Sequence, residues 1–98
     1  MPPVRITLEL PSALADVVGG RRTLAVELDG EDPTVSDLLD LVAGTHPHLE
    51  RRLRTESGQI RRHVNLYADG LDVRASAGTA TVLEQNTVVL VIPAVSGG

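Results

Sequence analysis

The amino-acid sequence predicts an α+β fold, in which a mixed sheet of about four to five strands packs on one main helix. Polar and apolar residues alternate strictly over residues 4–10, which is the pattern of a strand with one buried face. Over residues 35–42 the apolar residues instead recur with the helical spacing i, i+3, i+4 and i+7. Residues 88–92 are apolar without interruption, as expected of a central strand.

The N-terminal quarter predicts two strands. After the alternating residues 4–10, Pro11 and the pair Gly19-Gly20 interrupt the pattern. Alternation resumes over residues 24–28. We therefore expect a second strand that forms a hairpin with the first.

One amphipathic helix is predicted next. Thr34 precedes the helical pattern and Asp37 follows three residues later, which resembles a capping box with the acid in the usual Glu position. Gly44 and Pro47 are expected to end the helix, and residues 49–53 predict a further short helical turn. The stripe expected to face the sheet consists of Val35, Leu38, Leu39 and Val42.

The C-terminal half predicts the rest of the sheet. Residues 63–67 alternate, and Asp69-Gly70 favours a type I′ turn into a short strand at residues 71–73. Residues 75–80 are small and predict a loop before the apolar run at 88–92, which we expect to form the middle strand.

This order of elements predicts a β-grasp, or ubiquitin-like, fold over residues 1–93. Residues 94–98 carry too little apolar bulk to join the core, so we expect them to form a flexible tail that ends in two glycines. A chain of 98 residues is enough for one modest core and one domain.

Composition excludes several kinds of function. The chain has a net charge of -4, one aromatic residue (Tyr67) and no cysteine, which argues against nucleic-acid binding, disulfides and a thiolate nucleophile. No apolar run is long enough to span a membrane, and the N-terminus lacks the pattern of a signal peptide. We expect a cytoplasmic protein that is a monomer when free and binds partner proteins.

The chemical feature of the sequence is its end. A carboxylate on Gly98, five residues beyond Pro93, would sit on an arm that reaches about 15 Å. The side-chain-free Gly97-Gly98 pair would fit a narrow channel in a partner enzyme. A frayed or truncated terminus would look the same, so this feature alone does not decide the function.

Two segments carry a resemblance to a known family. Residues 62–74 (RHVNLYADGLDVR) and residues 91–98 (VIPAVSGG) resemble the corresponding stretches of ubiquitin-like sulfur carriers. That family includes the small subunit of molybdopterin synthase and the thiamine sulfur carrier, and the chain looks most like the cysteine-biosynthesis carrier of actinobacteria. Where the family often has Gly-Asp before the last strand, this sequence has Asn86-Thr87, and Asn tolerates the left-handed conformation of such a turn.

The resemblance implies a carrier and not an enzyme. An E1-like partner would adenylate Gly98 with ATP, and a persulfide would then convert Gly98 to a thiocarboxylate that donates sulfur to an acceptor enzyme. No bound cofactor is expected. The residues implied to enter the partner's active site are Pro93, Ala94, Val95, Ser96 and Gly97.

Other candidate sites are weaker. His46, His48 and His63 lack the convergent set of ligands that a metal site needs. Asp37 and Asp40 share a helix face but show no acid–base pairing. A basic cluster could be a docking patch or a solvated rim, and it consists of Arg51, Arg52, Arg54, Arg61 and Arg62.

Three alternatives to a free carrier stay open. The chain could be a molybdopterin synthase small subunit in a stable complex, a ubiquitin-like protein modifier, or an interaction domain with an inert tail. The sequence also leaves open the sulfur acceptor and the pathway, the activating enzyme, and which face of the last strand is exposed.

Overall fold

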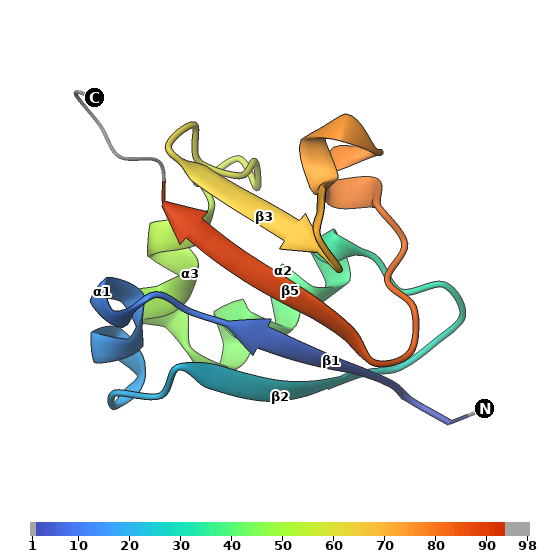
Figure 1. Cartoon of the computed structure of the whole chain (residues 1–98), viewed down its shortest axis with the longest axis horizontal. Helices are drawn as coiled ribbons and strands as arrows, with labels where there is room; N and C mark the ends of the chain where they lie inside the picture. Colours follow the sequence, from blue (N-terminus) through green and yellow to red (C-terminus); the bar gives the residue numbers. More distant parts are fainter. Residues whose placement is uncertain (1, 94–98) are drawn as a thin grey trace.

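A computed structural model describes residues 2–93 and shows a five-stranded mixed sheet in the order β2-β1-β5-β3-β4 (Figure 1). Its strands are β1 (Val4–Glu9), β2 (Thr23–Leu28), β3 (Val64–Ala68), β4 (Leu71–Asp72) and β5 (Thr87–Pro93). β5 runs parallel to β1, and the other neighbouring strands are antiparallel. The predicted β-grasp fold and the central place of the last strand are thus confirmed.

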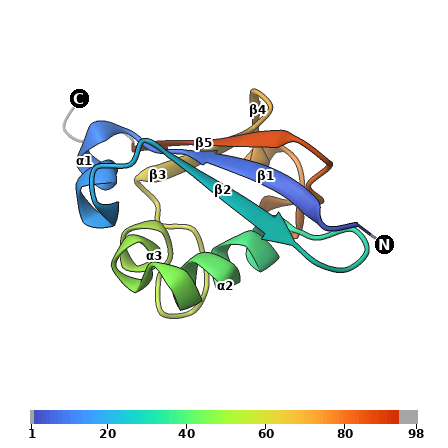
Figure 2. The same ribbon diagram turned by 90° about the horizontal axis from the view of Figure 1, so that it is seen from below.

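Two helices cover one face of this sheet, as Figure 2 shows. They are α2 (Val35–Thr45) and α3 (Pro47–Leu53). Short helical segments occupy the connections: α1 (Ser12–Ala15), η1 (Asp16–Val18), η2 (Val73–Ala75) and η3 (Gly78–Ala80).

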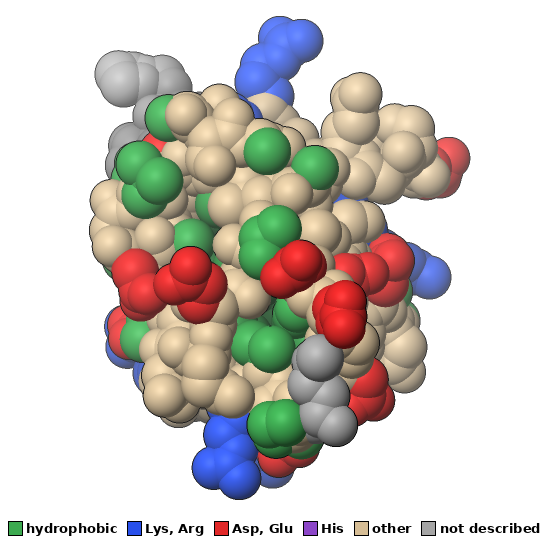
Figure 3. Space-filling model, turned by 90° about the vertical axis from the view of Figure 1, so that its right-hand side faces the viewer, with side chains coloured by type: hydrophobic (Ala, Val, Ile, Leu, Met, Phe, Trp, Pro, Cys, Tyr) green, Lys and Arg blue, Asp and Glu red, His purple; other side chains and the backbone are tan. Residues whose placement is uncertain are grey.

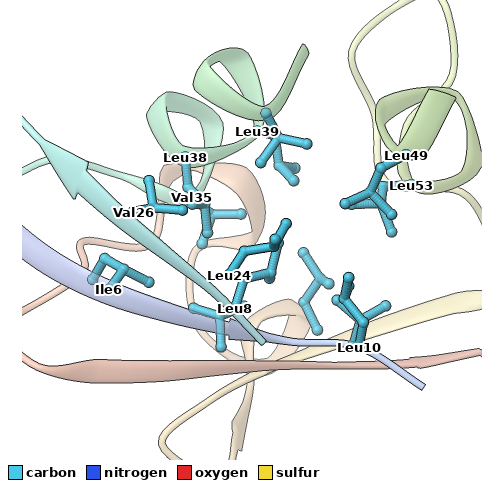
Figure 4. Packing of buried hydrophobic residues seen from close by; sticks show 14 of the residues in the cluster. Ile6, Leu8, Leu10, Leu24, Val26, Val35, Leu38, Leu39, Leu49 and Leu53 are labelled. Carbon is cyan, nitrogen blue, oxygen red and sulfur yellow. The ribbon is translucent and has the colours of Figure 1, made fainter. Parts of the chain in front are cut away.

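The core lies between the sheet and these two helices (Figure 4). The predicted stripe of α2 is fully buried, and Leu49 and Leu53 of α3 extend it. Ile6, Leu8 and Leu10 meet them from the first strand and the residue that follows it. With one aromatic residue in the chain, the core is built from Leu, Val and Ile, each of which contributes about 1.5–3 kcal/mol when fully buried.

The predicted capping box and the two predicted turns are present. Thr34 and Asp37 form a reciprocal capping box, with the Asp37 carboxylate accepting from the Thr34 N–H at 2.8 Å and the Thr34 hydroxyl accepting from the Asp37 N–H at 3.3 Å. Asp69 and Gly70 have φ values of 47° and 87°, as a type I′ turn requires. Asn86 has a φ of 66°, so it adopts the left-handed conformation expected for the turn before β5 although this turn lacks the Gly-Asp pair.

Three connections differ from the prediction. The link between β1 and β2 is helical, because the Pro11 carbonyl accepts from the N–H groups of Leu14 and Ala15 at 3.0 and 2.9 Å. The loop at residues 75–80 contains helical turns. The strand expected at residues 71–73 ends at Asp72, whose carboxylate accepts from the Arg74 N–H at 2.9 Å and starts η2.

Candidate functional site

Only the first of the six residues predicted to act at the C-terminal end lies in the described part of the chain. Pro93 is half-buried at the end of β5, opposite Val64 of β3. Ala94, Val95, Ser96, Gly97 and Gly98 fall outside the described residues, and so does the predicted tail.

The last residues of β5 have one paired edge and one open edge. The β3 edge is paired to the end, from Ala68↔Val89 to Val64↔Pro93. On the other edge, pairing with β1 stops at Glu9↔Leu90. The open edge adjoins a cavity of about 310 Å³, whose lining comes from Glu9, Leu10, Pro11, Arg22, Thr23 and the strand itself from Leu90 to Pro93.

β5 exposes an apolar stripe on the face of the sheet that the helices leave uncovered. Val89 and Val91 point into the core, with 0% and 1% of their surface exposed. Val88 and Leu90 are half-buried and Ile92 is exposed, so these three form the outward stripe. The sequence could not assign this phase, because a continuous apolar run has no alternation to show it. The stripe leads to the point where the tail begins.

A basic cleft lies on the β3 side of Pro93, next to Val64. Arg61, Arg62, His63 and Arg74, with three residues of the loop at 55–60, line a cavity of about 500 Å³ that we call the basic cleft. Arg74 is held over β3 by hydrogen bonds to Asn65 Oδ1 at 2.6 Å and to the Arg61 carbonyl at 2.9 Å. Sequence reasoning missed Arg74, because only the fold brings residues 61 and 74 together.

Arg54, one of the five arginines of the predicted basic cluster, is buried and paired with acidic side chains in the structure. Its side chain is only 9% exposed, its guanidinium donates to both carboxylate oxygens of Glu50, and its Nη2 lies 2.9 Å from Asp40. The hydrogen bond with Glu50 is the main reason that the pKa of Arg54 is raised. The local helical spacing explains the pairing, since Glu50 and Arg54 lie four residues apart.

The histidines and acids have structural or solvated positions. Within residues 2–93, no three His, Asp or Glu side chains gather as metal ligands would. Asp37 caps α2 and Asp40 forms an ion pair with Arg54. Each carboxylate therefore has a structural partner and is not paired with the other for acid–base catalysis. In the same range, none of the helices combines the length and apolar character required to cross a lipid bilayer.

Comparisons with known proteins agree with this architecture. Small archaeal modifier protein 1 from Haloferax volcanii is 40% identical over 81 residues, which are 83% of this chain and 87% of that protein. Sulfur carrier protein CysO from Mycobacterium tuberculosis is 32% identical over 97 residues, covering 97% of this chain and 100% of that one.

A solved structure of a similar protein has the same fold as this chain. The crystal structure of the Amycolatopsis orientalis BexX/CysO complex holds a chain with a TM-score of 0.79 and 28% identity, covering 95% of this chain and 99% of that one. The sequence model described as the ThiS family matches residues 11–98. The chain therefore belongs to the ThiS family.

Proposed function

We propose that this protein is a sulfur carrier and that the carboxyl group of Gly98 is its one covalent site. In the first step, the carboxylate attacks the α-phosphate of ATP on an E1-like partner, which gives an acyl adenylate and pyrophosphate. A sulfide or persulfide sulfur then displaces AMP. When the donor is a persulfide, a thiol cleaves the resulting S–S bond and releases the thiocarboxylate.

The extent of the family match is the observation that carries this proposal. It runs through residue 98 and so includes the diglycine end, together with the β5 strand that leads to it. The carrier from Mycobacterium tuberculosis aligns over 97% of this chain. A carboxylate is a poor electrophile until it bears a leaving group, whereas a thiocarboxylate is ionised and nucleophilic at neutral pH.

The described part of the chain, residues 2–93, would bind the partner enzyme and position the C-terminal end for this reaction. β5 is paired on its β3 side up to Pro93, so the sheet fixes the position of the last described residue before the diglycine end. The outward stripe of Val88, Leu90 and Ile92 offers a partner an apolar surface beside the tail. ATP is used by the partner, and the carrier is its protein cosubstrate.

Intact-protein mass spectrometry tests the proposal. The chain is incubated with ATP, an E1-like adenylating enzyme of the ThiS-family pathway and a sulfide or thiosulfate source. We expect a gain of about 16 Da, from one oxygen replaced by one sulfur, on the C-terminal peptide. The matched controls are a reaction without ATP and a chain that lacks Gly98. A chain that keeps its mass with active enzyme and donor contradicts the proposal.

A second function is favoured by one observation. The 40% identity to a protein named a small archaeal modifier supports a role in which Gly98 is joined to amines of target proteins. All nine basic residues of this chain are arginines, so it offers no lysine side chain for building chains on itself. Conjugates that each carry one copy would support this role, and their absence from lysates that hold the free chain would count against it.

A further inference from the structure

We infer that the basic cleft beside the tail binds an acidic surface at the mouth of the activating enzyme's channel. The inference rests on the proposed function and names the chemistry of the partner surface. It starts from the geometry of the tail's origin.

The tail is too short for the body to stay far from the enzyme. Residues 94–98 span at most about 15 Å, so a catalytic centre that reaches Gly98 lies within that distance of Pro93. The residues around Pro93 must therefore approach the rim of the channel. Val64 pairs with Pro93, and His63 and Arg62 directly precede it, so the basic cleft is part of this approaching surface.

The arginines of the cleft form no ion pair within the described residues, although Arg61 also lines a neighbouring cavity with Asp40, Glu50 and Glu56. Among residues 2–93, only Arg5 and Arg54 of the nine arginines form ion pairs with acids. The lining of the cleft includes no Asp or Glu. Glu9 lies on the other side of β5, where Arg22 accompanies it. The cleft thus presents arginines without an acidic lining residue on the β3 side of Pro93.

The opposite end of the molecule carries the opposite charge. Figure 3 views the side of the molecule where β5 begins and shows acidic side chains gathered there around exposed apolar ones. Glu31, Asp32 and Glu84 line one cavity at this end, which Val82 also lines. The acidic side chains of this cavity and the arginines of the basic cleft thus lie at opposite ends of β5. An acidic rim on the enzyme would attract the tail end and repel the other end, so the molecule would arrive with its tail forward.

Charge variants at the two ends of β5 test the inference. Arg62 lies in the cleft and makes no side-chain hydrogen bond among the described residues, so Arg62→Gln and Arg62→Glu should fold normally. Arg5 lies beside the start of β5, where its carbonyl accepts from the Asn86 N–H at 2.8 Å, so Arg5→Gln and Arg5→Glu are controls about 20 Å away. The Arg5 side chain is 74% exposed and lies 4.0 Å from Glu27, so losing this ion pair should cost little stability. Circular dichroism checks that all four variants are folded.

The readout is the KM and kcat for the carrier in thiocarboxylate formation, using the enzyme that converts the wild-type chain. We expect Arg62→Gln to raise KM about two- to fivefold without a change in kcat, and Arg62→Glu to raise it further. Added salt should raise the wild-type KM towards that of the variant. The Arg5 variants should change KM much less than the Arg62 variants, because salt screens a charge that lies about 20 Å from Pro93.

Two results would overturn the inference while leaving the proposed function intact. An unchanged KM in both Arg62 variants would show that the cleft has no role in docking. A lower KM would show that the cleft instead holds the chain's own terminal carboxylate and competes with the enzyme. If the wild-type chain itself gains no sulfur, the proposed function fails and the inference fails with it.

Discussion

Single residues show which charges serve the fold and which stay available to partners. Arg54 and Arg62 both belong to the basic cluster expected from the sequence, yet only Arg62 is exposed. Arg54 and Glu50 satisfy each other at the junction of α3 and the following loop, with 9% and 16% of their side chains exposed. Burial and pairing therefore separate two arginines that look alike in the sequence.

The Arg54 pair predicts a stability effect. Arg54→Met keeps most of the side-chain length but leaves the Glu50 carboxylate without its partner, so we expect a loss of about 2–3 kcal/mol in urea unfolding. Asp40→Asn should cost less than about 1 kcal/mol, because that side chain is 65% exposed. Equal stability of Arg54→Met and the wild type would show that this ion pair does not support the fold.

The raised pKa of Arg54 fixes how its contribution to the free energy of unfolding depends on pH. Because folding raises the pKa of this guanidinium, its contribution is fully present below the unfolded pKa and is lost only as the pH rises through the folded one. Both values lie in the strongly alkaline range, so the penalty of Arg54→Met should stay constant between about pH 6 and pH 9. Urea unfolding at several pH values measures it.

Asn86 predicts a backbone effect. Its φ of 66° is accessible to Gly and tolerated by Asn, but it is costly for a β-branched residue. We expect Asn86→Val to lower the free energy of unfolding by about 1–2 kcal/mol, with Asn86→Gly within about 0.5 kcal/mol of the wild type. Thermal unfolding of both variants checks this, and a harmless Asn86→Val would refute the strained turn.

At the scale of elements, β5 has one buried face and one face that stays partly exposed. Val89 and Val91 fill the core, while Val88, Leu90 and Ile92 line the outer face that leads to Pro93. The continuous apolar run predicted a central strand correctly because both faces of β5 carry aliphatic side chains. The run could not reveal which face is buried, since that depends on pairing with β1 and β3.

The two faces predict different costs of truncation. Val91→Ala removes two methyl groups from a site with 1% exposure, so we expect a loss of about 2 kcal/mol. Ile92→Ala acts at a site that is 42% exposed and should cost less than about 1 kcal/mol. Denaturant unfolding compares the pair, and a larger loss for Ile92→Ala would mean that the phase of β5 is inverted.

At the scale of the whole molecule, local patterns predicted the elements and the central place of the last strand, but not all of the connections and side-chain contacts. The capping box at Thr34 and the turn at Asp69 depend on neighbouring residues, which is why the sequence was sufficient for them. The helical link after Pro11 was missed, since Ser12–Ala15 is too short to show a helical period. The basic cleft was missed in part, because it forms only when Arg74 folds back over Asn65 and Arg61.

The state of Gly98 in the cell distinguishes a sulfur carrier from a protein modifier or an inert interaction domain. We would measure it by intact-mass and C-terminal peptide analysis of the untagged chain, purified from its native cell under non-reducing, alkylating conditions. We expect a fraction of chains to carry a thiocarboxylate, trapped as an alkylated thioester on Gly98. Chains found only as the carboxylate in cells with active sulfur metabolism, or found only joined to lysines of other proteins, would contradict it.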